Sequence, residues 1–433
     1  MVFRCISDFL GMRGPGFPES EGDASPVALV PACDVNKKYS EPLDSGENSD
    51  VGSIAGCCSS GGSTGSTSPG PRWPQFELQA VEPMTQASLE ELMQEVSLDV
   101  AAWDAESFVH VKTLQDAIKN HTHVDHMEQS LEGTMRSVAV KRLPNRWMQR
   151  GPEEFKAQQP LAAERPWCDL GIVKYLNSIS FPFACDLLGV CRDEENTYAI
   201  TSLATSGNLF HWCDRDPRPG PSREQVMYPI VRQVFIGITY LHELGIAHRD
   251  ISLENILLTD RAGGGLQVKI IDFAMATPTR MCCQEARGKP SYQAPEMHGD
   301  AEYDAFLADV FSLGVVVFAM AFKDYPWAST KSDTCALFGY AKRCGLRKFL
   351  EKRRLRNGAP DEHLGDVVSP ALAGLLEGLM KVEPEQRSTL GEACFNTLGT
   401  SASAWSMEWL QGNSSAGACS AMRRSGSNRL AGG

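Results

Sequence analysis

The pattern of apolar and polar residues divides the chain into a patterned middle and two polar ends. Residues 1–75 are rich in Gly, Ser, Pro and Asp and include the run SSGGSTGSTSPG. Such a segment buries too little apolar surface to offset the entropy lost when it becomes ordered. We therefore predict a disordered N-terminal region at 1–75, a linker at 76–104, a folded domain at 105–400 and a largely disordered tail at 401–433.

The linker contains the pattern of a short helix. Ser88 followed by Glu91 has the form of a capping box. The apolar residues of this segment recur at helical spacing: Leu89, Leu92, Met93 and Val96. Two interpretations stay open, namely a helix that packs on the folded domain and a partly formed helix within a linker.

Within the folded domain, strands are predicted first and long helices later. Residues 108–114 and 137–142 read as strands. Apolar residues at helical spacing predict a long helix over 227–241, and residues 311–320 are apolar on nearly all sides, which predicts a buried helix. Because we find no apolar run of the ~18 residues needed to cross a bilayer, we expect no membrane span.

Charge and cysteine usage narrow the class of protein. The net charge of −13 argues against a nucleic-acid partner, which would favour a basic face, and against binding to an anionic membrane surface. The 14 cysteines are scattered, and two pairs are vicinal, unlike the framework of a small secreted protein. We predict a reduced intracellular protein, located in the cytoplasm, with the nucleus left open.

Three segments carry side chains suited to phosphoryl transfer. The sequence HRDISLENILL places Asp250 and, five residues later, Asn255 in one loop. Phosphoryl transfer needs one group that orients the attacking hydroxyl and oxygen ligands that hold a hard cation. The segment VKIIDFAMA ends a strand at Asp272, which we expect beside this loop. The segment VAVK ends a strand at Lys141, which is placed to neutralise phosphate oxygens.

Together and in this order, the three segments resemble the signature set of the eukaryotic protein kinases. Further on, SYQAPEM resembles the motif that ends an activation segment, and ADVFSLGVVVF resembles the buried helix whose Asp309 supports the catalytic loop. EPEQR resembles the site of the late Arg387, which pairs with Glu296. The resemblance covers residues 105–400 and implies an α+β, bilobal protein kinase fold, with a small β-rich N-lobe and a larger helical C-lobe.

The resemblance also implies an activity and a set of site residues. LEN and PSYQAPE are similar to the Ser/Thr type, so the implied reaction transfers the γ-phosphoryl group of ATP, with Mg²⁺, to Ser or Thr of protein substrates. Asp250 would be the catalytic base, Arg249 would contact the activation segment, and Lys141 would bind the α- and β-phosphates. Asn255 and Asp272 would bind Mg²⁺. The implied adenosine contacts are Thr201 as gatekeeper, the backbone of Leu203 and Ala204, Asn208 near the ribose, and Ala139 and Leu257 around the adenine ring.

Two departures concern the phosphate-binding side of the site. The loop that should cover the phosphates falls on IKNHTHV, residues 118–124, which contains no glycine. Glycines there let backbone N–H groups approach phosphate. Lys119, His121 and His123 are candidate replacements, and the alternative is that this loop makes no phosphate contact. In addition, Ala274 stands where the Asp-Phe-Gly motif of the resembled family has its glycine.

A third departure concerns the carboxylate that should pair with Lys141. The segment AERPWCDLGIVKYLNSISFPF offers Asp169, which we favour, or Glu164. Pro166 is expected to mark the start of the helix that carries this carboxylate, because proline is tolerated in the first helical turn.

Two positions suggest a displaced cation. Ser252 stands where the resembled Ser/Thr kinases usually have a Lys near the γ-phosphate, and Lys289 stands where they usually have a Thr. Because these positions touch in the resembled fold, we count Lys289 among the candidate catalytic residues; the alternative is a solvent-facing lysine. Eleven residues before Glu296, where an activating phosphothreonine often lies, the sequence has Glu285. This predicts a permanent pair with Arg249.

Two functions follow from these features. Retention of Lys141, Asp250, Asn255 and Asp272 favours an active Ser/Thr kinase. The missing glycines and the uncertain helix carboxylate favour a pseudokinase, which would act as a nucleotide-binding or scaffolding module. Ser/Thr clusters in residues 1–75 could accept phosphate under either function.

Overall fold

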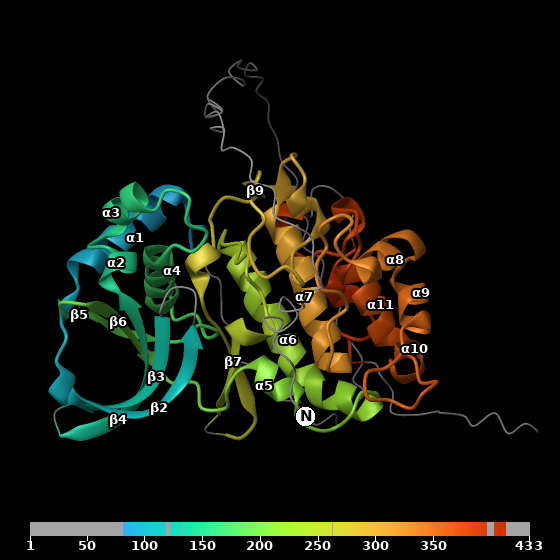
Figure 1. Cartoon of the computed structure of the whole chain (residues 1–433), viewed down its shortest axis with the longest axis horizontal. Helices are drawn as coiled ribbons and strands as arrows, with labels where there is room; N and C mark the ends of the chain where they lie inside the picture. The colour runs from blue at the N-terminus through green and yellow to red at the C-terminus, as the bar shows by residue number, and fades with distance from the viewer. Residues whose placement is uncertain (1–80, 118–121, 132, 262, 396–401, 413–433) are drawn as a thin grey trace, which may run out of the picture. The chain divides into compact units, whose positions relative to one another are not determined.

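The computed structural model describes residues 81–117, 122–131, 133–261, 263–395 and 402–412 (Figure 1). The disorder predicted for residues 1–75 and 413–433 lies outside these residues. Residues 402–412 differ from the prediction of a disordered tail. Trp409 is buried, its indole N–H donates to Glu224 over 3.0 Å, and its ring packs edge-on against Tyr228. An aromatic anchor therefore attaches this segment to the helical part of the domain.

Six strands form the sheet of the N-terminal part, and all neighbouring strands are antiparallel except β1 and β5. In spatial order they are β1 (Ala101–Ala102), β5 (Leu187–Arg192), β6 (Asn196–Ser202), β4 (Thr134–Pro144), β3 (Thr122–Leu131) and β2 (Phe108–Ala117). The two predicted strands are therefore present as parts of β2 and β4. Because side chains alternate along a strand, the buried Val138 and Val140 leave Ala139 and Lys141 on the opposite face of the sheet.

Four helices accompany this sheet: α1 (Gln86–Leu98), α2 (Asn145–Met148), α3 (Pro152–Gln158) and α4 (Pro166–Ser178). Helix α4 begins at Pro166, as predicted. Helix α1 is present, but its N-cap lies three residues before the predicted cap Ser88. Thr85 is the N-cap, and its side chain and that of Ser88 accept each other's backbone N–H groups. Ser88 is thus the third helical residue and not the cap. The N–H groups at the start of a helix lack partners within it, and here Thr85 and Ser88 together provide them.

The C-terminal part is mainly helical (Figure 1). Its helices are α5 (Leu209–Cys213), α6 (Pro221–Glu243), α7 (Ala305–Phe322), α8 (Ala336–Cys344), α9 (Leu346–Lys352), α10 (Leu364–Val367) and α11 (Pro370–Leu379). Two small antiparallel pairs join β7 (Ile256–Asp260) to β8 (Leu266–Ile270) and β9 (Met281–Cys282) to β10 (Tyr303–Asp304). Short 3-10 turns complete the chain: η2 (Ala105–Ser107), η3 (Leu253–Asn255), η4 (Phe273–Met275), η5 (Pro295–His298), η6 (Pro384–Gln386), η7 (Ala393–Phe395) and η8 (Ala404–Ser406).

The helices predicted at 227–241 and 311–320 are parts of α6 and α7. Helix α7 corrects the expectation that no apolar run is long enough to cross a bilayer. Among the described residues, α7 alone is long and apolar enough to do so. However, 94% of it is buried inside the protein. Such a helix is apolar on all sides because it lies in the core.

Candidate active site

Lys141, on β4, forms an ion pair with α4. Its Nζ lies 3.0 Å from Oδ2 of Asp169 and 3.5 Å from Oδ1 of Asp272. Burial opposes the charge on Lys141, but the two carboxylates outweigh it and raise the pKa of the ammonium well above its usual value. Of the two carboxylates that the sequence left open, Asp169 forms the pair. Glu164 precedes the helix, whose N-cap is Arg165.

Asp169 also holds the segment that follows Asp272. Its Oδ1 accepts the backbone N–H of Phe273 over 2.9 Å. Asp272 has left-handed backbone dihedrals, with φ 66°, which is uncommon for a residue with a side chain and is typical of functional sites. Burial raises the pKa of the Asp272 carboxyl, but the charge of Lys141 above all, and that of Lys289, outweigh burial and lower it. Asp272 is therefore an anion beside a cation.

The catalytic loop brings Asp250 and Asn255 together. Nδ2 of Asn255 donates to Oδ2 of Asp250 and to its backbone carbonyl, both over 2.8 Å. This orientation turns the amide oxygen of Asn255 away from Asp250. Oδ1 of Asp250 is buried and has no hydrogen-bond partner among the described residues. Burial raises the pKa of Asp250 to about 6, even though the charge of Lys289 acts in the opposite direction.

Asp309 supports this loop from the buried helix α7. Its two carboxylate oxygens accept the backbone N–H groups of His248, over 2.7 Å, and of Arg249, over 2.8 Å. His242 of α6 lies 3.1 Å from the same carboxylate and 2.7 Å from Glu392. His242 and Glu392 were not predicted. His242 had a usable signal, because it lies four residues after Ile238 on the apolar stripe of α6, whereas nothing in the local pattern of Glu392 marks it as buried.

Arg249 connects the loop to the following segment. Its Nε donates to the carbonyl of Met275, and its Nη1 lies 2.7 Å from Oε2 of Glu285. Arg287 lies 3.3 Å from the same carboxylate oxygen. The segment ends at Glu296, which forms two bonds of 2.5 and 2.9 Å with Arg387.

Lys289 and Ser252 are in contact. Nζ of Lys289 donates to Oγ of Ser252 over 2.7 Å and lies 3.1 Å from Oε2 of Glu254. Glu254 was not predicted as a partner of Lys289, although its place in the LEN motif beside Ser252 was a usable signal. The positive charge of Lys289 acts on both Asp250 and Asp272. It lowers the pKa of Asp272 further, and it offsets part of the rise that burial causes in the pKa of Asp250.

The predicted adenosine-contacting residues lie on adjoining elements. Ala139 of β4 pairs in register with Thr201 of β6, and Asn208 bridges to Leu257 of β7. Leu203 and Ala204 are half-buried in the connection that follows β6. Asn208 has an additional structural role, because its side chain accepts the backbone N–H of His211 and caps α5.

The phosphate-covering loop lies largely outside the described residues, and this includes Lys119 and His121. The structure corrects its predicted extent. Thr122, His123 and Val124 belong to β3, where His123 pairs in register with Arg142 and Val124 with Lys141. Strand pairing therefore continues further toward the turn than the count from Lys141 suggested.

The site thus lies in a domain of two parts, one with a sheet and one mainly helical. It combines the ion pair of Lys141 and Asp169 with the loop that holds Asp250 and Asn255. A model of the protein kinase domain family matches residues 134–397, more than half of the chain. The chain therefore belongs to the protein kinase family.

Several curated kinases are similar to parts of this chain. A stretch of 144 residues, 33% of the chain, is 38% identical to the probable serine/threonine-protein kinase KCC4 of Saccharomyces cerevisiae and covers 13% of it. A stretch of 231 residues, 53% of the chain, is 29% identical to the serine/threonine-protein kinase GIN4 of the same yeast and covers 18% of it. A stretch of 238 residues, 54% of the chain, is 29% identical to the serine/threonine-protein kinase SBK1 of Danio rerio and covers 57% of it. The matches span less than two thirds of these relatives.

Proposed function

We propose that this protein is an active kinase that transfers the γ-phosphoryl group of ATP to Ser or Thr hydroxyls of protein substrates. The observation that carries the proposal is the buried Oδ1 of Asp250, for which the described part of the chain offers no hydrogen-bond partner. A buried polar atom without a partner is costly and rare in proteins. A substrate hydroxyl that donates to this oxygen would satisfy it.

The residues present fit a bound Mg²⁺ ion. The Asp272 carboxylate and the amide oxygen of Asn255 are the hard oxygen ligands that Mg²⁺ takes. Among the described residues no group of three or more His, Cys, Asp or Glu side chains is arranged to hold a metal ion. This agrees with an ion that is completed by substrate phosphates and water. When bound, Mg²⁺ neutralises charge on the phosphates.

The roles of the side chains follow from their positions. The oxygen of the substrate hydroxyl bonds to the γ-phosphorus, and Asp250 accepts the proton of that hydroxyl. The bond from the γ-phosphorus to the β,γ-bridging oxygen breaks at the same time, which releases ADP. Lys141, fixed by Asp169, binds the α- and β-phosphates. Most of the barrier reduction comes from this positioning and from charge neutralisation.

The test is transfer of radiolabelled phosphate from ATP to peptide libraries with a central Ser, Thr or Tyr, in the presence of Mg²⁺. We expect labelling of the Ser and Thr libraries. Asp272→Asn should lower transfer at least about a hundredfold, because it removes a charged ligand of the Mg²⁺ ion that neutralises the reacting phosphates, and should leave the thermal unfolding midpoint nearly unchanged. Asp300→Asn, at an exposed position, is the matched control.

Equal transfer by the wild type and Asp272→Asn would contradict the proposal. Binding of nucleotide without transfer by the wild type would instead support the pseudokinase alternative. Labelling of the Tyr library alone would refute the Ser/Thr assignment.

A further inference from the structure

Helix α1 precedes the residues that match the protein kinase family, yet it is part of the hydrophobic core. Leu89 is 1% exposed and belongs to the main core cluster, together with Cys168 and Ile172 of α4. Val96, two turns further along α1, belongs to a second cluster with Trp167 and Leu170. One helix therefore contributes to both clusters, and α4 lies in both as well.

Gly171 of α4 lies directly against α1. A Cβ atom at this position would lie 3.0 Å from Cγ of Met93 and 3.3 Å from Cδ1 of Leu89. Glycine inside a helix costs about 1 kcal/mol relative to alanine, and here its lack of a side chain permits the close approach of α1. One turn further on, Nζ of Lys174 lies 3.3 Å from Glu95 and 3.0 Å from Asp99.

Both ends of this segment are attached to other parts of the domain. Before α1, the N–H of Met84 donates to the carbonyl of Leu244 at the end of α6, over 2.8 Å. After α1, the strand β1 extends the sheet beside β5. Trp103 then stacks on Tyr198 and Phe108, with ring centroids 4.0 and 4.3 Å apart. Residues 84–103, which we call the strap, thus run from the helical part of the domain across α4 to the sheet.

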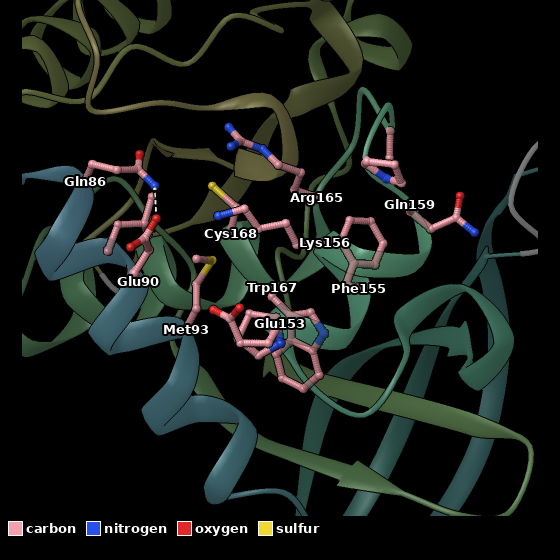
Figure 2. Close-up of a pocket in the computed structure, with 14 residues that line it drawn as sticks. Gln86, Glu90, Met93, Glu153, Phe155, Lys156, Gln159, Arg165, Trp167 and Cys168 are labelled. Atoms are coloured by element: carbon pink, nitrogen blue, oxygen red, sulfur yellow. Dashed lines mark hydrogen bonds between the residues drawn. The ribbon is translucent and has the colours of Figure 1, made fainter. Parts of the chain in front are cut away.

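A partly open cavity of about 240 Å³ lies beside the contact between α1 and α4. Figure 2 shows Glu90 and Met93 of α1 on one side of it, and Arg165, Trp167 and Cys168 at the start of α4 on another. Helix α3 and the residues that follow it contribute the remaining wall. The strap is held to the N-terminal part by its packing on α4, by the pairing of β1 with β5 and by the stacking of Trp103 on Tyr198.

The position of α4 matters because it carries Asp169. One oxygen of Asp169 binds Lys141, and the other accepts the N–H of Phe273 next to Asp272. A displacement of α4 by about 1 Å away from these partners would lengthen both contacts beyond hydrogen-bond distance.

We propose that the strap is a positioning element for catalysis, which holds α4 where Asp169 reaches both Lys141 and Phe273. The inference rests on the proposed kinase activity for its kinetic readout. It assigns a function in the reaction to residues that precede the family match.

The experiment uses the full-length protein with Gly171→Leu, which places a side chain between α1 and α4. We expect kcat to fall at least about tenfold, with faster hydrogen exchange in peptides from residues 166–178. Cys168, a buried thiol at the cavity, should also be alkylated faster. The matched control is Gly374→Leu in α11, where an added Cβ meets nothing within 4 Å.

A second variant guards against misfolding of Gly171→Leu. Lys174→Glu replaces two attractions by repulsions, and adding Asp99→Lys should restore part of kcat and of the exchange protection. Unchanged exchange in α4 in both Gly171→Leu and Lys174→Glu would overturn the proposal. Equal losses in Gly374→Leu would also overturn it, as would changed exchange with unchanged kcat. If the wild type shows no transfer, the proposed function fails, and exchange in α4 and in the Phe273 segment then decides whether the strap holds Asp169.

Discussion

Ser252 and Lys289 illustrate how single residues shape this site. Ser252 is completely buried, and the ammonium that contacts it arrives from a segment 37 residues away in sequence. Glu254 shares this ammonium. We propose that Lys289 supplies the positive charge near the γ-phosphate and that Glu254 keeps the Lys289 side chain directed toward the catalytic loop.

The proposed role of Lys289 predicts strong coupling between two substitutions. Lys289→Thr should lower kcat by about 10- to 1000-fold, because it removes the cation proposed to lie beside the transferred phosphate. Ser252→Lys should also lower kcat, since it crowds two ammonium groups at a buried position. The double variant should recover much of the loss, which a double-mutant cycle on kcat measures. Lys348→Thr, at an exposed position, is the control. Additive losses would show that Lys289 is a surface charge.

At the scale of elements, the segment between η4 and η5 is held by a carboxylate. Glu285 lies within reach of Arg249 and Arg287, and its backbone carbonyl accepts the hydroxyl of Tyr303 over 2.7 Å. Burial raises the pKa of Glu285, but the two arginines outweigh it and lower the pKa. The carboxylate therefore stays charged through the neutral range, without any modification.

We expect a kinase whose activation segment needs no phosphate. Phosphatase treatment should leave kcat unchanged, whereas Glu285→Gln should lower kcat several-fold, because Arg249 loses its charged partner. Glu302→Gln, at an exposed position nearby, should have no effect. Loss of activity on phosphatase treatment, with recovery when this segment is phosphorylated, would contradict the prediction.

At the scale of the whole molecule, one buried histidine joins three distant parts of the chain. His242 of α6 lies between Asp309 of α7 and Glu392 near the end of the domain. Burial lowers its pKa, but hydrogen bonds to the two carboxylates outweigh burial and raise the pKa to about 9. Because Asp309 also holds the catalytic loop, the charge on this histidine connects global stability to the site.

This arrangement predicts a loss of stability at alkaline pH. The folded protein keeps the proton up to about pH 9, whereas the unfolded chain releases it near pH 6.5. The contribution is therefore full below pH 6.5 and is lost as the pH rises through about 9. We expect the free energy of unfolding in urea to fall by about 3 kcal/mol over this range. His242→Asn should flatten the dependence, and His110→Asn, at a largely exposed side chain, should not. An equal slope in His242→Asn would refute the assignment.

The sequence by itself determined those features that depend on spacing along the chain. The distance between Asp250 and Asn255, the strand that ends at Lys141, the helix that begins at Pro166 and the buried helix at 311–320 are all written in short-range patterns. These patterns follow from the periods of strands and helices and from the fixed dihedral of proline. The protein kinase fold followed from their order.

The tertiary structure decided which side chains meet across elements. The choice of Asp169 over Glu164 depends on where α4 lies against the sheet, and that position is set by packing at Gly171 and by the strap. The partners of Lys289 and the pairing of His242 likewise join residues more than 30 positions apart. Local propensity carries no information on such contacts, because they depend on how whole elements pack. For this reason the sequence pattern of α1 was equally compatible with a helix in a linker and with a helix packed in the core.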